Sequence, residues 1–198
     1  MSKITSAAAP KAARHSMTTR TLAGCALLAA MSVVLARFVI PMPAVDQRFS
    51  LEAVPIFIAG MLFGPIPGAL VGFSADLVGC LFSGYGYNPL FCVPPILYGL
   101  SAGLFRPLLL KKTTPLTIGL SFLPPIALGS ILYQSATLAY VYGKGAFLPN
   151  FLVKLSTRSV QFAITFVLDV LVVYLLYKSK VFAAVRLWPA AQKTEDKE

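Results

Sequence analysis

The sequence predicts an all-α integral membrane protein, a bundle of six transmembrane helices with both termini in the cytoplasm. Hydrophobic residues make up 57% of the 198 residues, and the mean hydropathy is +0.77. Charged residues make up only 12%, about half the share that a soluble domain carries. The apolar residues also gather into six stretches that few charges interrupt, as expected of helices that cross a bilayer.

Each apolar stretch is predicted to form one helix. The stretches cover residues 21–40, 51–64, 66–82, 91–110, 116–141 and 151–177. The second is short, because a helix of 14 residues rises only about 21 Å against a hydrocarbon core of about 30 Å. The second and third therefore form either two short spans or a re-entrant hairpin around residues 64–68. The first, at about 20 residues, exceeds the apolar region of 7–15 residues that is usual in a secretory signal.

The basic residues orient the predicted bundle. Four of the 17 Lys and Arg precede the first helix, three follow the fourth and five follow the sixth. Arg48 and Lys144 are the basic residues of the opposite connections, with Arg37 at the outer end of the first helix. Because cytoplasmic segments carry the excess of Lys and Arg, both termini are expected in the cytoplasm. Residues 1–17 and 181–198 are expected to be tails, the first of them disordered, flanking one membrane domain over 18–180.

Several function classes are excluded by composition and motif. A net charge of +10 is compatible with nucleic acid, but the chain has too few polar residues for a soluble basic domain, and an anionic membrane surface is the better partner. One His and three Cys do not suffice for a His-rich metal centre or a disulfide framework. No Walker A loop, His-Glu-x-x-His or Gly-x-Ser-x-Gly motif is present. We therefore expect no enzyme activity, no metal and no ATP hydrolysis by this chain.

The last apolar stretch carries polar residues on one side. Lys154, Arg158, Gln161, Thr165 and Asp169 follow one another at spacings of three or four, which places them within about 80° of the helix circumference. An ionised group at the bilayer centre costs about 2.5–3.5 kcal/mol. This stripe must therefore face protein or water.

The two bases of the stripe are candidate ligand-binding residues. Lys154 and Arg158 are one turn apart near the outer start of the helix, and like charges at that spacing repel unless an anion lies between them. An anionic ligand from outside would meet them first. Alternatively, both reach the headgroups or pair with an acid in the bundle. Asp169 lies deeper and is interpreted as structural.

Three other regions add candidate polar contacts. Asp76 is a single acid among small and apolar residues of the third stretch, where it either pairs with an Arg or accepts hydrogen bonds from ligand N–H groups. Gln134 belongs to a weaker polar stripe in the fifth stretch, which either joins helices or lines the same cavity. Tyr85 and Tyr87 lie in a Gly-rich outer loop, suited to a lid over a planar ligand or to the aromatic belt of the membrane interface.

The first stretch has a face of small residues in its cytoplasmic half. Ala23, Ala26 and Ala30 share one side of the helix, with Gly24 beside them. Small residues at such spacings let another helix approach closely. The partner helix belongs either to this chain or to another subunit.

One stretch of sequence is similar to a known family. It contains Arg48-Phe49-Ser50-Leu51-Glu52-Ala53-Val54-Pro55-Ile56-Phe57, then Gly60, Phe63-Gly64-Pro65, Gly68, Gly72 and Ala75-Asp76-Leu77-Val78-Gly79. This string resembles the folate-specific S components, the substrate-binding subunits of energy-coupling factor (ECF) vitamin transporters. The likeness is densest over 48–79 and extends more loosely from about 20 to 178.

The resemblance implies a role as well as a fold. Such subunits capture a vitamin from outside with high affinity, dock on a membrane T component that carries two ATP-binding subunits, and are thought to topple in the membrane to release the vitamin inward. They bind no cofactor themselves, and ATP is used only by the partner subunits. The family's alanine motif falls on Ala26-Leu27-Leu28-Ala29-Ala30, so Ala26, Ala29 and Ala30 would contact the T component.

Folate chemistry assigns roles to the candidate residues. The pterin ring presents a donor edge for Asp76 and a flat face for Tyr85 or Tyr87. The glutamate carboxylates would meet Arg37, Arg48, Lys154 or Arg158, and the amides of Gln134 and Gln161 would line the same cavity. The loops that hold Arg48 and the two Tyr would cap the pocket.

Three other functions remain open at this stage. An S component for another vitamin, such as pantothenate or a pterin-like or nucleobase-like compound, would have the same fold. A stand-alone secondary transporter is expected to show internal repeats, and none is visible. An integral membrane enzyme is disfavoured because paired acids, a nucleophile motif and an intramembrane His are missing.

Overall fold

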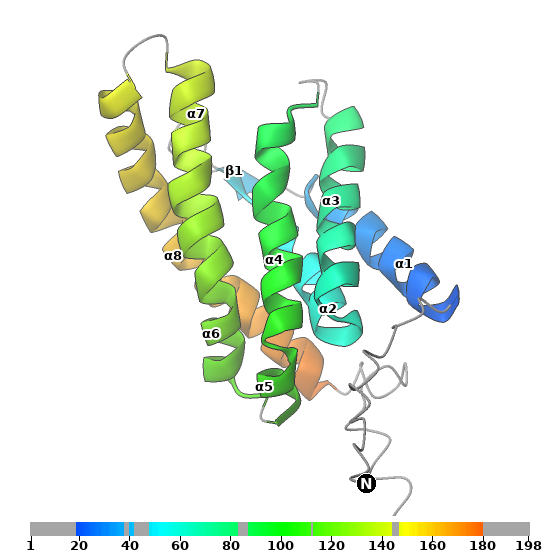
Figure 1. Cartoon of the computed structure of the whole chain (residues 1–198). Coiled ribbons are helices and arrows are strands. Elements are labelled where there is room, and N and C mark those ends of the chain that lie inside the picture. The colour runs from blue at the N-terminus through cyan, green and yellow to red at the C-terminus, as the bar shows by residue number, and fades with distance from the viewer. Residues whose placement is uncertain are drawn as a thin grey trace, which may run out of the picture.

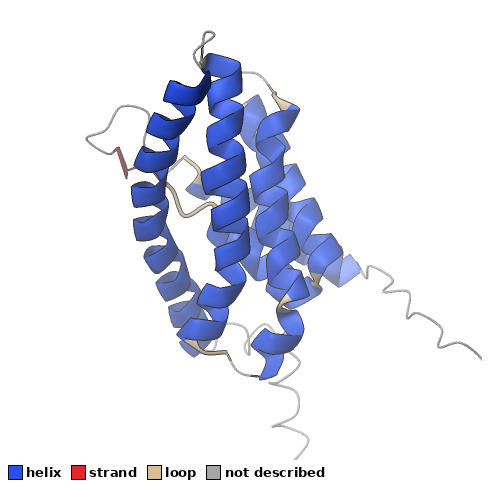
Figure 2. Ribbon diagram, turned by 60° about the vertical axis from the view of Figure 1, so that its left-hand side comes forward, coloured by secondary structure: helices blue, strands red, loops and turns tan. Residues whose placement is uncertain are grey.

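A computed structural model describes residues 19–37, 40–41, 48–82, 87–111, 113–143 and 147–179 of the chain, nearly all of them in helices (Figures 1 and 2). The helices are α1 (Thr19–Leu35), α2 (Ala53–Phe63), α3 (Pro65–Leu81), α4 (Val93–Leu104), α5 (Arg106–Lys111), α6 (Pro115–Pro124), α7 (Gln134–Tyr142) and α8 (Phe147–Lys178). A 3-10 turn, η1 (Pro89–Cys92), leads into α4, and a π-helical segment, η2 (Pro125–Tyr133), joins α6 to α7. The prediction of an all-α class is thus confirmed at the level of a helical bundle.

The predicted stretches each contain a helix, with three local differences. The fourth stretch breaks at Phe105 into α4 and α5, and α8 begins four residues earlier than the sixth stretch. Two strands of two residues each, β1 (Ile40–Pro41) and β2 (Arg48–Phe49), pair antiparallel between α1 and α2. Nothing in the apolar pattern predicts this pair, because two residues are too few to show an alternation.

Two helices among the described residues are long and apolar enough to cross a membrane. The first is the continuous rod formed by α6, η2 and α7 over Pro115–Tyr142, which has 28 residues, and the second is α8, which has 32. The rod starts at a capping box, in which the side chains of Thr114 and Thr117 each bond to the other's backbone amide, and Pro115 occupies the first helical position. The other apolar helices are shorter and pack around α2 and α4.

The helix α2 forms the centre of the bundle. All of its residues from Ala53 to Leu62 are buried, and the ring of Phe57 stacks on that of Phe122 of α6 with centroids 3.8 Å apart. The chain reverses from α2 into α3 at Gly64, whose φ of 105° is open to glycine at little cost. A helix surrounded by protein in this way needs no full membrane span of its own.

Glycines bring α2, α3 and α4 into backbone contact. A Cβ atom placed on Gly99 of α4 would lie 2.0 Å from the carbonyl oxygen of Gly68 of α3. A Cβ atom on Gly60 of α2 would lie 2.2 Å from the carbonyl oxygen of Gly99. Without a hydrophobic effect in lipid, such close approach is a main source of helix association. These three helices form the rigid half of the bundle.

The surface and the interior have the polarity expected in a membrane. Large apolar side chains are exposed along the outer faces of several helices, including Leu22 and Leu27 of α1, Leu120 of α6, and Ile164 and Leu171 of α8. The interior contains polar residues such as Ser32, Ser101, Ser130, Gln161 and Asp169. A soluble protein of this size would not expose so much continuous apolar surface, whereas lipid solvates it.

Candidate functional site

The polar stripe of α8 faces the interior of the bundle, as predicted. Gln161, Thr165 and Asp169 are buried, and Lys154 and Arg158 are half-buried. Residues on the opposite side of the same helix are exposed, among them Val160, Ile164, Val167 and Leu168. The stripe therefore presents cationic, amide and acidic groups to the inside of the protein along about four helical turns.

Arg158 joins α8 to two other helices. Its Nη1 donates a hydrogen bond of 3.1 Å to the backbone carbonyl of Ser130 in η2, and its guanidinium lies 5.7 Å from the ring centroid of Phe162. The hydroxyl of Ser130 is in turn hydrogen-bonded at 2.9 Å to the hydroxyl of Tyr98 of α4. We call Tyr98, Ser130, Arg158 and Asp169 the Arg158 cluster.

The π-helical turn explains why Ser130 accepts from Arg158. In an α-helix the amide of Gln134 would bond to the carbonyl of Ser130, four residues earlier. Here the amide of Gln134 bonds to Gly129, five residues earlier. The carbonyl of Ser130 is released from that bond and accepts from the guanidinium instead. π-helical segments inside α-helices are frequent at functional sites.

Acidic groups lie on the other side of Tyr98. Asp169 is fully buried, and Glu52, the residue before α2, is its electrostatic neighbour. The carboxyl groups of Asp169 and Glu52 also interact electrostatically with the phenol of Tyr98. The hydroxyl of Ser32 in α1 donates to the backbone carbonyl of Glu52 at 2.7 Å and so fixes the start of α2 against α1. The Arg158 cluster is therefore cationic toward one end of α8 and acidic toward the other.

A second group of polar residues lies at the end of α3. The carboxyl of Asp76 and the thiol of Cys92 are hydrogen-bonded, and the hydroxyl of Tyr87 is hydrogen-bonded to the same thiol. An ionised carboxylate only accepts, so the thiol donates to Asp76 and the hydroxyl of Tyr87 donates to the sulfur. The second carboxyl oxygen of Asp76 is buried and has no partner among the described residues. We call Asp76, Tyr87, Cys92 and Arg37 the Asp76 cluster.

Arg37 is engaged by the backbone of α3. Its Nη2 donates a hydrogen bond of 2.7 Å to the carbonyl oxygen of Gly79, in the last turn of that helix. A cation there neutralises the negative end of the helix dipole. The Arg37 side chain thus ties the end of α1 to the end of α3 at the Asp76 cluster.

The structure separates the predicted site residues into groups. Arg158 and Gln161 belong to the buried stripe with Lys154, whereas Arg37, Asp76 and Tyr87 meet at the end of α3. Gln134 is half-buried at the start of α7, beside the π-helical turn. Arg48 is described by its backbone in β2 alone, and Tyr85 lies outside the described residues, as do the two predicted tails.

The three alanines assigned to a partner do not share one environment. Ala26 and Ala30 are exposed on α1, and Ala29 is half-buried against the core. Leu22, Leu27 and Met31 are exposed on the same helix. Two of the three alanines are therefore available to a partner helix.

Sequence reasoning missed several residues of the two clusters. In the sequence, Tyr98 resembles any other aromatic residue of an apolar helix. Its hydroxyl is nevertheless a signal of a polar contact, because a buried tyrosine hydroxyl usually has a hydrogen-bond partner. Cys92 gives no signal beyond its apolar character. Asp169 was expected to be structural, yet it has no hydrogen-bond partner among the described residues.

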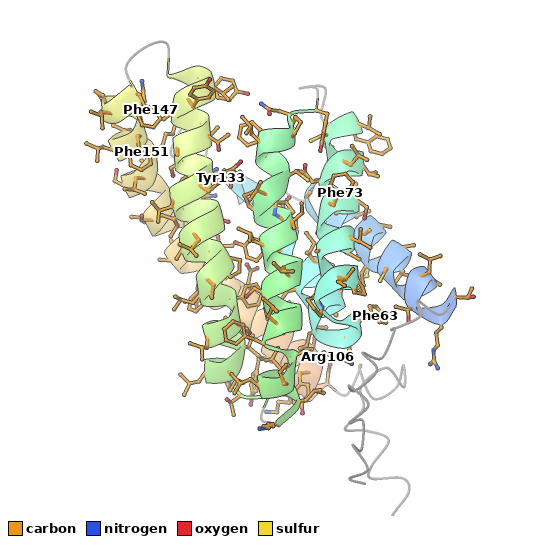
Figure 3. The ribbon with its side chains drawn as sticks, viewed as in Figure 1. Phe63, Phe73, Arg106, Tyr133, Phe147 and Phe151 are labelled. Atoms are coloured by element: carbon orange, nitrogen blue, oxygen red, sulfur yellow. The ribbon has the colours of Figure 1, made fainter. Side chains whose placement is uncertain are left out.

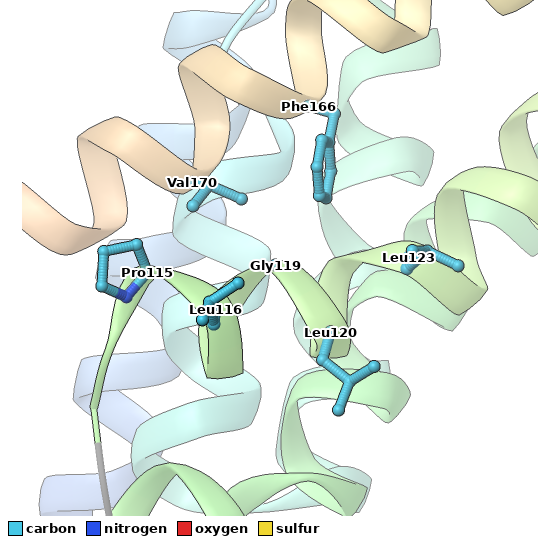
Figure 4. A pocket seen from close by; sticks show the side chains of 7 residues that line it. All are labelled: Pro115, Leu116, Gly119, Leu120, Leu123, Phe166 and Val170. Carbon is cyan, nitrogen blue, oxygen red and sulfur yellow. The ribbon is translucent and has the colours of Figure 1, made fainter.

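An apolar groove lies apart from both clusters. It has a volume of about 340 Å³ and runs between α6 and α8, lined by Pro115, Leu116, Gly119, Leu120, Leu123, Phe166 and Val170 (Figure 4). No polar side chain lines it, so it suits a lipid chain better than a polar ligand. Within the described residues no group of three or more His, Cys, Asp or Glu is arranged to hold a metal.

The two ends of the bundle differ in chemistry. Phe147 and Phe151 stack with centroids 5.8 Å apart where α7 and α8 meet, and Arg106 lies at the far end (Figure 3). Lys154 and Arg158 follow within two to three turns of the aromatic end. The bases of the stripe therefore lie between an aromatic rim and the buried acid.

Comparison with known proteins identifies the family. The profile of the family described as "ECF-type riboflavin transporter, S component" matches residues 16–179, which is more than half of the chain. The chain belongs to this S-component family. It is therefore a membrane transport component and not an enzyme.

Two solved structures are similar to this one. A crystal structure of FolT bound with folic acid is 29% identical, with a TM-score of 0.67, over 80% of this chain and 93% of that one. An S component for biotin from an ECF-type ABC transporter is 18% identical, with a TM-score of 0.57, over 82% and 95% of the two chains, and shows the fold alone. An uncharacterised Mycoplasma pneumoniae protein, the MG098 homolog, is 36% identical over 64 residues, which are 32% of this chain and 13% of that relative.

Proposed function

We propose that this S component captures folate from outside the cell and delivers it inward by docking on a T component that carries two ATP-binding subunits. The observation that carries the proposal is the stripe of α8, in which Gln161 is buried and the half-buried Arg158 is an electrostatic neighbour of Tyr98. The bases of such a stripe offer charge-assisted hydrogen bonds to the carboxylates of a ligand. The side-chain amide of Gln161 offers hydrogen bonds to a heterocycle. The likeness to a relative solved with folic acid supports the same ligand.

The proposed binding residues are those predicted from sequence, together with Tyr98. Lys154 and Arg158 would hold the glutamate carboxylates, with Arg37 and Arg48 as further bases at the rim. Gln134 and Gln161 would line the cavity, and Asp76, Tyr85 and Tyr87 would close it on the outer side. Nanomolar binding requires about −12 kcal/mol, toward which one aromatic stack and two charge-assisted contacts in a closed pocket would contribute.

The proposed topology has six spans with both termini in the cytoplasm of a plasma-membrane protein. The distribution of Lys and Arg supports it, because twelve of the 17 lie in the two tails and in the connection after the fourth span. Residues 18–180 would then be the binding domain. Ala26 and Ala30 on the exposed face of α1, with Ala29 beside them, would contact the T component. ATP would be used only by the partner subunits.

Riboflavin is the second candidate ligand, because the description of the matching family names it. It is also a planar heterocycle, but it has no carboxylate for the bases of the stripe. Equilibrium binding of tritiated folate to the detergent-solubilised protein decides between them. We expect sub-micromolar binding that folate relatives compete and that riboflavin and pantothenate do not. Competition by riboflavin at equal concentration would contradict the proposal.

A further inference from the structure

Asp169 is a buried carboxyl group whose partner is missing. It is 0% exposed, and neither of its carboxyl oxygens has a hydrogen-bond partner among the described residues. Most buried polar groups in proteins are hydrogen-bonded, so an exception requires an explanation. In a membrane protein an ionisable group of this kind marks a functional site by default.

Among the described residues, no base forms an ion pair with Asp169. Its electrostatic neighbours are the acid Glu52 and the hydroxyl of Tyr98, and Arg158 is engaged with the carbonyl of Ser130. Thr165, one turn away on the same face, donates its hydroxyl to the carbonyl of Gln161 in its own helix. The groups beside Asp169 are thus acidic or already hydrogen-bonded, which favours a ligand that brings hydrogen-bond donors.

The stripe also has a direction. Arg158 lies 11 residues before Asp169 in α8 and Lys154 lies 15 residues before it, which at 1.5 Å per residue is about 16 and 22 Å. An acid at one end and two bases at the other match an elongated ligand with donor N–H groups at one end and carboxylates at the other.

We propose that Asp169 accepts hydrogen bonds from the N–H donor edge of the ligand's planar ring, so that the ligand lies along α8 with its ring deep and its carboxylates at Arg158 and Lys154. This assignment rests on the proposed folate function and gives the donor edge to Asp169 in place of Asp76. One oxygen of Asp76 is unpartnered as well, but the carboxyl group of Asp76 already accepts from Cys92 and belongs to the other cluster.

Fragments of folate test the orientation. Tritiated folate binding is measured for wild type, Asp169→Asn and the control Ser156→Ala on the exposed side of α8, with 6-methylpterin as the ring fragment and p-aminobenzoylglutamate as the carboxylate fragment. We expect Asp169→Asn to weaken folate binding at least tenfold and to abolish competition by 6-methylpterin. For Asp169→Asn, the inhibition constant of p-aminobenzoylglutamate should stay near its wild-type value, and Ser156→Ala should bind all three ligands as wild type does.

A measurement on the wild-type protein covers the case in which Asp169→Asn fails to fold. Dicyclohexylcarbodiimide modifies buried carboxyl groups, and mass spectrometry locates the adduct. Folate and 6-methylpterin should protect Asp169, and p-aminobenzoylglutamate should not. Undiminished labelling of Asp169 at saturating folate, or a well-folded Asp169→Asn with wild-type affinity for both folate and 6-methylpterin, would overturn the assignment. Failure of wild type to bind folate at all would instead refute the proposed function beneath it.

Discussion

Arg158 is the residue on which the interior of this protein depends most visibly. Its guanidinium bonds to the backbone of η2 and lies near Phe162, while Ser130 connects the same point to Tyr98 of α4. The direction in which Arg158 faces was predictable, because helical spacing alone places the stripe on one side. The hydrogen-bond partner of Arg158 was not predictable, because the π-helical segment that frees the carbonyl of Ser130 from the amide of Gln134 leaves no pattern in the sequence.

Substitution of Arg158 should reduce ligand affinity more than stability. We expect Arg158→Ala to weaken folate binding at least tenfold, which is about 1.4 kcal/mol, because a charge-assisted contact is lost. Arg158→Lys should recover only part of the affinity, because a point charge lacks the planar fork of the guanidinium. Binding is measured with tritiated folate and stability by thermal unfolding. Ser156→Ala, on the exposed side of α8, is the control, and wild-type affinity in Arg158→Ala would remove this residue from the site.

The thiol of Cys92 tests the second cluster by a graded substitution. Cys92→Ser keeps a donor for Asp76 and an acceptor for Tyr87, whereas Cys92→Ala removes both. If the chain from Tyr87 through Cys92 positions Asp76 and the outer loop, Cys92→Ala should weaken ligand binding several-fold and Cys92→Ser should restore it. Cys80→Ala serves as the matched control, because Cys80 is a neighbouring thiol that forms no disulfide. Equal affinity in the Ala and Ser variants would show that the thiol only fills space.

At the scale of elements, two kinds of helix contact coexist. The helices α2, α3 and α4 meet through glycines at backbone distance, whereas polar side chains hydrogen-bond α8 to η2 and η2 to α4. The sequence predicted a helix for each apolar stretch, because length and hydropathy suffice for that. It did not predict that α2 is enclosed by protein, because its uniformly apolar composition has no preferred side. The break at Phe105 and the β1–β2 pair show no period in the sequence.

Two glycine substitutions should separate the effect of close helix packing on stability from the effect of helix propensity. Gly99→Ala places a methyl group against the backbone of Gly68, so we expect a loss of at least about 1–3 kcal/mol of stability. Gly79→Ala has open space around its new Cβ atom and should be neutral or stabilising by about 0.5–1 kcal/mol, as for other glycines inside helices. Thermal unfolding in detergent measures both. Equal stability of the two variants would contradict the close packing of α3 on α4.

At the scale of the whole molecule, the outer surface is apolar and the inner seam is polar, as the composition predicted. Two regions connect this bundle to function: the stripe of α8 inside, and the exposed face of α1 outside. The alanine spacing on α1 predicted a close helix contact but could not tell a partner subunit from internal packing. The structure leaves Ala26 and Ala30 exposed, which favours the partner.

Bulky side chains on that face should uncouple capture from transport. We expect Ala26→Trp and Ala30→Trp to bind folate as wild type does and to lose folate uptake in cells that supply the T component and its ATP-binding subunits. Ala163→Trp, on the exposed side of α8, adds the same bulk elsewhere and should leave uptake intact. Normal uptake by both α1 variants would assign the alanine face to lipid.

The position of the bound vitamin tests the proposed binding site most directly. A crystal structure of the protein grown with folate would show it. We predict that the ligand lies between α8, α4 and η2, with its carboxylates at Arg158 and its ring toward Asp169. Folate bound elsewhere, with the α8 stripe unchanged and no ligand atom within hydrogen-bonding distance of Arg158 or Gln161, would contradict it.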